Sequence, residues 1–122
     1  QSVMTHRAPA AIGPYSQAIL MNNILFVSGQ LGIDPGTSLI PESFEEQANL
    51  VFNNIKAILD AAGMGLSNIV KVSVFLQDLD DFTLLNEIYM RYFSAPYPAR
   101  EVVQVLRLPQ NGKIEISVIA MR

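Results

Sequence analysis

Few side chains in this sequence are able to carry out chemistry. His6 is its only histidine, and it contains no cysteine. These two facts exclude a serine–histidine triad, a cysteine nucleophile, a disulfide and a thiolate metal site, and they leave no second imidazole for a zinc or iron centre. The run from Gly29 to Gly32 precedes no predicted helix, so no nucleotide-binding loop is indicated. His6 falls in residues 1–7, a segment expected to be flexible, and is interpreted as a surface residue.

Two charged residues inside predicted strands remain as candidates. Alternation along residues 113–119 places Ile114 on one face of a strand and Glu115 on the other. Arg100 opens the preceding predicted strand. A tight turn at 109–112 would make these two strands antiparallel and separate Arg100 from Glu115 by about 20 Å, at ~3.3 Å per residue. Either both are solvated edge charges, or they meet across an interface between two copies of the chain.

The composition indicates a protein that associates with copies of itself. The chain has 122 residues, of which 50% are hydrophobic and 16% charged, whereas soluble chains average about 25% charged. One domain over residues 1–122 is expected, and its apolar surface favours a homo-oligomer. The net charge of -3, with no cluster of Lys and Arg, argues against a nucleic-acid partner. No apolar run reaches the roughly 18 residues of a membrane span, and without a visible secretory signal the cytoplasm is the expected location.

The elements that must position the candidates follow the order β-β-α-β-α-β-β. Asn22 and Asn23 predict a hairpin turn, while Ser43 with Glu46 predicts a capped helix start and Gly63 its end. The predicted strands cover residues 16–21, 24–30, 69–76, 100–108 and 113–121, and a second helix begins within 78–81 and ends before Pro96. We therefore expect an α+β fold with one mostly antiparallel sheet of five or six strands. Because two helices cover only one sheet face, the other apolar face is expected to contact a neighbouring subunit.

Five spaced motifs carry a family resemblance that extends from about Ala8 to the C-terminus. They are APAAIGPYSQ at 8–17, VSGQ at 27–30, Asn86, PAR at 98–100 and KIEI at 113–116. In these the chain closely resembles the RidA (YjgF) family of reactive-intermediate deaminases. The resemblance implies a chorismate-mutase-like fold, assembled as a homotrimer with sites in the clefts between subunits.

The resemblance also implies an activity and a set of site residues. Relatives in this family hydrolyse enamines and imines, such as 2-aminoacrylate or 2-aminocrotonate, to 2-keto acids and ammonia; the enzyme class implied is a 2-iminopropanoate/2-iminobutanoate deaminase, a hydrolase of C–N bonds without metal or cofactor. Arg100 would grip the substrate carboxylate, and Glu115 would position water or shuttle a proton. The implied substrate-binding residues are Tyr15, Ser28, Gly29, Asn86 and Val102.

Three residues depart from the family pattern. Val102 stands where a cysteine is often found, which makes that wall of the site apolar. Glu101 adds a carboxylate next to Arg100, and alternation is expected to point it to the opposite face. Ser117 replaces an acid often found two residues after Glu115. Substrate preference and activity level therefore stay open at this point.

Two other functions compete with a deaminase. One is a non-catalytic trimer that binds small carboxylates or acts as a chaperone. The other is an RNA-cleaving translation inhibitor, which the acidic charge balance makes the least favoured.

Overall fold

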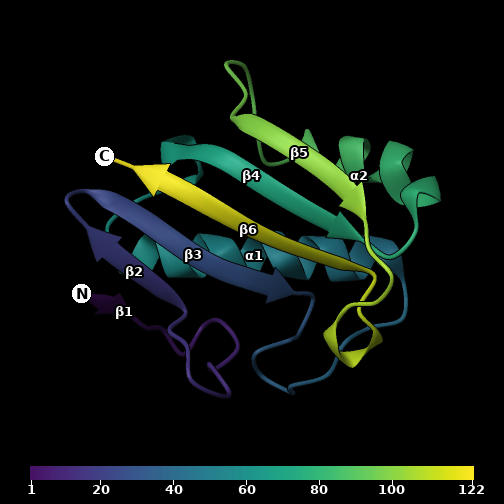
Figure 1. Ribbon diagram of the computed structural model, residues 1–122, viewed down its shortest axis with the longest axis horizontal. Coiled ribbons are helices and arrows are strands. Elements are labelled where there is room, and N and C mark those ends of the chain that lie inside the picture. The colour runs from purple at the N-terminus through teal and green to yellow at the C-terminus, as the bar shows by residue number, and fades with distance from the viewer.

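The computed structural model describes all residues 1–122, and both of its helices cover one face of a single sheet (Figure 1). Strand order across the sheet is β1-β2-β3-β6-β4-β5, and every pairing is antiparallel except that of β4 with β5. The strands are β1 (Ser2–Val3), β2 (Ala18–Met21), β3 (Ile24–Leu31), β4 (Ile69–Leu76), β5 (Ala99–Gln104) and β6 (Ile114–Met121), the helices α1 (Phe44–Ala61) and α2 (Phe82–Tyr89), and the 3-10 turns η1 (Leu66–Asn68), η2 (Leu79–Asp81) and η3 (Pro109–Asn111). The predicted α+β class is confirmed.

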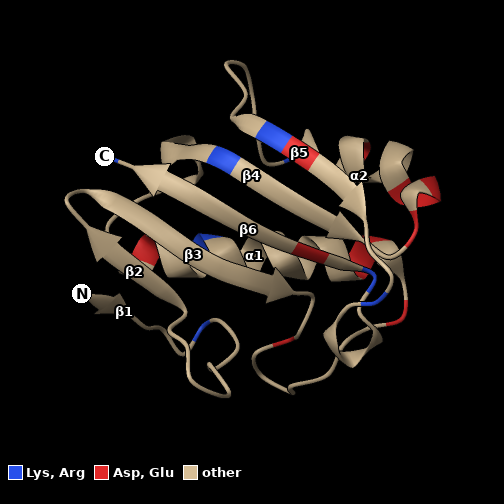
Figure 2. Ribbon diagram, viewed as in Figure 1, with Lys and Arg blue, Asp and Glu red and all other residues tan.

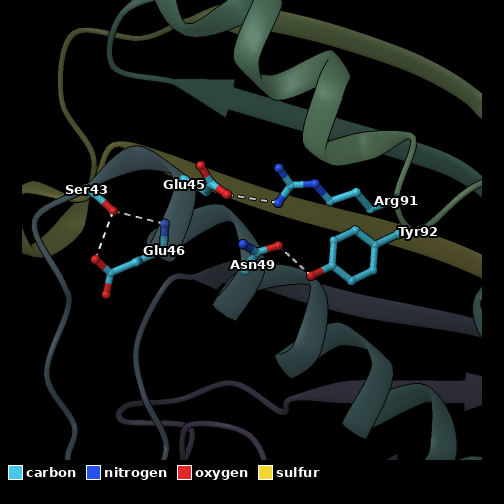
Figure 3. Close-up of polar contacts among 6 residues, drawn as sticks. All are labelled: Ser43, Glu45, Glu46, Asn49, Arg91 and Tyr92. Atoms are coloured by element: carbon cyan, nitrogen blue, oxygen red, sulfur yellow. Dashed lines mark hydrogen bonds and ion pairs between the residues drawn. The ribbon is translucent and has the colours of Figure 1, made fainter.

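Both ends of α1 form as the local sequence predicts. Ser43 Oγ accepts a hydrogen bond from the Glu46 amide at 3.1 Å and donates one to the Glu46 carboxylate at 3.2 Å (Figure 3). Gly63 follows the helix with φ +72°, the left-handed conformation in which helices commonly end. The apolar face between these caps packs on β3 and β6; its fully buried side chains include Val51, Phe52, Ile55, Ile58 and Leu59.

The hairpin between β2 and β3 is also confirmed. Asn22 and Asn23 both have positive φ, 49° and 66°, as tight hairpin turns require. An additional short strand, β1, pairs with β2 and was not predicted, because two residues carry no periodicity. Gln17 holds the following loop by accepting from the Thr5 amide at 2.8 Å and donating to the Pro9 carbonyl at 2.8 Å. The flexibility of residues 1–7 stays a prediction.

The predicted hairpin between the last two strands is wrong. β6 inserts between β3 and β4, whereas β5 pairs in parallel with the outer edge of β4 and ends at Gln104. Burial explains the order, because every inward residue of β6 is at most 3% exposed, whereas β5 has no buried residue. A strand whose inward face is buried along its whole length therefore lies at the centre of the sheet, and the strand without buried residues lies at its edge. Residues 105–113 pass across its end, and Asn111 has the positive φ typical of its type, but within the turn η3.

No helix covers the opposite face of the sheet in the single chain (Figure 1), and this face is largely apolar. Its exposed or half-buried apolar side chains include Ile19, Met21, Phe26, Phe75, Val103, Ile119 and Met121. Four charged residues lie in strands, namely Lys71, Arg100, Glu101 and Glu115, and Figure 2 shows them as isolated bands on β4, β5 and β6. Such a face is poorly suited to permanent contact with water.

Candidate functional site

Arg100 lies at the start of β5, on the sheet face that the helices cover. Its register opposite the buried Val72 directs the side chain toward α2. There the guanidinium lies 4.7 Å from the ring centroid of Tyr89 and 5.8 Å from that of Phe82. Aromatic faces attract a cation without neutralising its charge. No carboxylate of the chain pairs with Arg100, so its fork of donors is available to an anion.

A cavity of about 460 Å³ opens beside this guanidinium. It brings together Arg100 and Asn86, two of the predicted site residues, on β5 and α2. Its remaining lining residues are Tyr89, Met90, Tyr97 and Pro98. A smaller hollow of about 280 Å³ near the start of α1 contains no predicted site residue. The cavity next to Arg100 is therefore the one that contains predicted site residues.

Glu115 lies on the opposite, open face of the sheet, at the central strand β6. Its neighbours Ile114 and Ile116 are fully buried beneath the helices, so alternation directs Glu115 outward. The carboxyl group is half-buried and pairs with no basic side chain. Burial raises the pKa of Glu115 above its usual value. A carboxyl group with a raised pKa is suited to proton transfer near neutral pH.

A bulge in β3 brings the chain against this carboxyl group. Between Val27 and Gln30 the register with β6 shifts by one residue, so Ser28 and Gly29 together oppose Ser117. A Cβ atom on Gly29 would lie 2.7 Å from the Glu115 Oε2 atom. Position 29 therefore requires glycine to let the carboxyl group lie against the backbone.

Ser28 ties the loop that carries Tyr15 to the same bulge. Its hydroxyl donates a hydrogen bond to the Ser16 carbonyl at 2.6 Å, and its amide donates to the Gln17 carbonyl at 2.9 Å. The Ser28 hydroxyl can still accept a hydrogen bond, but its proton is already donated to the Ser16 carbonyl. Tyr15 is 52% exposed at the edge of this region. Three predicted residues, Ser28, Gly29 and Glu115, thus form a second group, and Tyr15 precedes Ser16 on the loop that is bonded to it.

The two groups do not meet within one chain. Arg100 is level with Val72 and Glu115 with Phe75, and β4 lies between their strands. Three residues along and two strands across correspond to a Cα separation of ~14 Å, from spacings of about 3.3 and 4.8 Å. The sequence-based distance of about 20 Å is corrected accordingly, because it assumed a hairpin. The side chains moreover point to opposite faces, and Figure 2 shows β4 separating the charged bands of β5 and β6.

Glu101 does not interfere with Arg100. It points to the open face, where its carboxylate pairs with Lys71 at 3.1 Å and accepts a hydrogen bond from Ser73. The Ser73 hydrogen bond, followed by Lys71, lowers the pKa of Glu101. Val102 shares the face of Arg100 and packs against the core, as alternation predicts. The additional carboxylate is therefore neutralised away from the Arg100 cavity.

The sequence analysis did not predict the aromatic ring of Tyr89 that lies against the Arg100 guanidinium. Tyr89 is 5% exposed, as is usual for an aromatic core residue of a helix, but its ring also lies against the guanidinium. No sequence periodicity distinguishes a core residue from one that also supports a cation.

The structure contains no cluster of three or more His, Cys, Asp or Glu side chains that could hold a metal ion. Neither helix is both long and apolar enough to cross a membrane.

Several known proteins are similar to this chain in sequence and in structure. A cattle protein named 2-iminobutanoate/2-iminopropanoate deaminase is 46% identical over 98% of this chain and 88% of its own. An Arabidopsis thaliana protein named Reactive Intermediate Deaminase A, chloroplastic, is 52% identical over 97% of this chain and 64% of its own. Among solved structures, RidA from the Antarctic bacterium Psychrobacter superposes with a TM-score of 0.98 at 50% identity, covering 100% of this chain and 99% of that one.

A second solved structure was determined with a small molecule. Escherichia coli TdcF with bound serine superposes with a TM-score of 0.96 at 45% identity, covering 100% of this chain and 98% of that one. The family model described as Endoribonuclease L-PSP matches residues 5–122. By this match, by its relatives and by its fold, the chain belongs to the RidA (YjgF) family.

Proposed function

We propose that the protein is a hydrolytic deaminase of small 2-imino acids and their enamine tautomers, of the 2-iminopropanoate and 2-iminobutanoate type. The observation that carries the proposal concerns the four charges in the sheet. Lys71 and Glu101 pair with each other, whereas Arg100 and Glu115 have no ionic partner in the chain. Two unpaired, partly buried charges of opposite sign suit a substrate that carries a carboxylate and needs proton transfer.

Hydrolysis of an imino acid mainly requires that the substrate and water are positioned for reaction. Arg100 binds the carboxylate of the imino acid in bidentate fashion. Water adds to the C=N carbon, and Glu115 takes a proton from that water and returns it to the nitrogen. As the C–N bond of the resulting carbinolamine breaks, its hydroxyl proton passes to the nitrogen and the C=O bond forms, so one water molecule is consumed for each ammonia and 2-oxo acid released. Further contacts to the substrate come from Tyr15, Ser28, the Gly29 amide, Asn86 and the apolar Val102.

The site lies between subunits of a homotrimer in this proposal. Because Arg100 and Glu115 point to opposite faces of one sheet, a single chain does not enclose a small molecule with both. A second copy that covers the open face offers the missing half, and it also buries the apolar side chains there. Three copies is the number that the family resemblance implies, and a repeated head-to-tail contact closes such a ring.

The direct test is ammonia release from 2-iminobutanoate generated in situ. The wild-type protein is expected to accelerate release over buffer, and Arg100→Ala to abolish the acceleration. No acceleration by the folded wild-type protein would overturn the proposal. Sedimentation gives the mass of the assembly, and a stable monomer would refute the shared site.

A non-catalytic carboxylate-binding trimer is the second candidate, because the E. coli relative was solved with bound serine. Glu115→Gln separates the two functions. A deaminase variant binds a 2-oxo acid but turns over poorly, whereas a binding protein keeps its function. RNA cleavage has less support, since the chain has 8 basic against 11 acidic residues and Figure 2 shows the basic positions scattered. The cytoplasmic location stays a prediction.

A further inference from the structure

Tyr89 combines a buried ring with a hydroxyl group that has no partner. The residue is 5% exposed, and its Oη atom makes no hydrogen bond within the chain. The ring is held at 4.5 Å from the Phe93 ring and at 6.0 Å, edge-on, from the Phe52 ring. A buried hydroxyl without a partner is destabilising relative to a paired one, so its presence in a packed cluster asks for an explanation.

The neighbouring tyrosine shows what a satisfied hydroxyl looks like in the same cluster. Tyr92 stacks on Phe52 at 4.5 Å, and its hydroxyl donates to Asn49 Oδ1 at 2.6 Å (Figure 3). Tyr92 is therefore a structural tyrosine that joins the turn after α2 to α1. Tyr89 fills a comparable place in the core without such a bond.

The surroundings of Tyr89 supply a reason for its free hydroxyl. The residue Tyr89 lines the same 460 Å³ cavity as Arg100 and Asn86, with its Oη atom buried in the single chain. Asn86 precedes Tyr89 by three residues, which places both on one side of α2. Its ring lies 4.7 Å from the guanidinium. Whatever anion Arg100 binds in this cavity comes close to the Tyr89 ring.

We propose that Tyr89 is a further substrate-binding residue, whose ring supports the Arg100 guanidinium and whose hydroxyl donates a hydrogen bond to the carboxylate that Arg100 holds. An ionised carboxylate only accepts hydrogen bonds, and a tyrosine hydroxyl supplies a donor. Burial raises the pKa of Tyr89, and the nearby positive charge of Arg100 only partly opposes this. The hydroxyl therefore keeps its proton at neutral pH, where the carboxylate is charged.

Tyr89→Phe tests the hydroxyl while it keeps the ring. The probe is 2-oxobutanoate, a stable 2-oxo acid, with its dissociation constant measured by calorimetry. This inference rests on the proposed role of Arg100, so Arg100→Ala is measured alongside. Loss of a hydrogen bond to a charged group predicts an increase of about tenfold in the dissociation constant of Tyr89→Phe. KM for 2-iminobutanoate rises by a similar factor while kcat changes little, because the carboxylate bond is equally strong in ground and transition states.

Tyr92→Phe is the matched control. It loses the bond to Asn49, so its thermal midpoint falls by about 4 °C, while its affinity for 2-oxobutanoate stays that of the wild type. Tyr89→Phe shows the reverse, with an unchanged or higher midpoint because no bond is lost in the free protein. Tyr89→Leu also removes the aromatic platform and weakens binding by a further factor of about three.

The possible results distinguish the role of Tyr89 from the role of Arg100. Wild-type affinity in Tyr89→Phe, with affinity lost in Arg100→Ala, would overturn the role of Tyr89 and leave the proposed function standing. Wild-type affinity in both variants would refute the Arg100 site itself. Equal weakening in Tyr89→Phe and Tyr92→Phe would point to a disturbed aromatic cluster and would also overturn the inference.

Discussion

Hybrid trimers of two inactive variants should regain activity. The variants are Arg100→Ala and Glu115→Gln, each of which removes one half of the proposed site. Within one chain these residues are ~14 Å apart by sheet spacing and face opposite sides. A site made from Arg100 of one copy and Glu115 of the next therefore needs one intact residue from each neighbour. In a random equimolar mixture each requirement is met at half of the sites, so activity returns to about one quarter of wild type.

The assay is ammonia release from 2-iminobutanoate by the two variants co-expressed with different affinity tags. Native mass spectrometry verifies that mixed trimers form. As a control, the wild type is mixed with the double variant, and the shared site predicts about one quarter of full activity in place of the half that a site within one chain gives. Mixed trimers with no more activity than the parent variants would refute the reasoning.

Three local features yield further expectations. Gly29→Ala places a methyl group against the Glu115 carboxyl group and should lower kcat/KM by about 100-fold with the circular dichroism spectrum unchanged; a wild-type rate would contradict the contact. Because burial raises the pKa of Glu115, the folded state keeps a proton that the unfolded state releases, and the free energy of unfolding falls as pH rises through the raised pKa. The thermal midpoint of Glu115→Gln should therefore lie above that of the wild type at neutral pH and match it near pH 3.5, below the ordinary pKa of about 4.3. A midpoint below that of the wild type at neutral pH would contradict this expectation. Ser43→Ala removes the cap that Glu46 shares and should cost about 1 kcal/mol in chemical unfolding; no change would show that the cap is dispensable.

Local chemistry accounts for the parts of the fold that were predictable. Ser43, Glu46 and Gly63 specify where α1 begins and ends through groups a few residues apart. Asn22 and Asn23 specify a turn by their tolerance of positive φ. Strand alternation separates Ile114 from Glu115 because side chains change face at every residue. None of these inferences needs knowledge of the neighbouring strand.

Strand order was not predictable in the same way, since it depends on competition between strands for the centre of the sheet. The turn residues at 109–112 suit a hairpin, but the burial of the inward face of β6, between β3 and β4, outweighs that preference. The bulge at Ser28 and Gly29 is equally non-local, because only the register with β6 reveals it. For the same reason the contact between Arg100 and Tyr89 became apparent only with the packing of α2 on β5.

The position of each charge in the sheet explains why a neighbouring copy would complete the site. Arg100 lies on the edge strand β5, so another molecule can approach its cavity from the side of the sheet. Glu115 lies on the central strand β6 and is reached only from the open face. A contact that joins the β5 edge of one copy to the open face of the next would cover the apolar side chains there and bring both charges to one ligand. The low content of charged residues and the divided site are then two consequences of the same assembly.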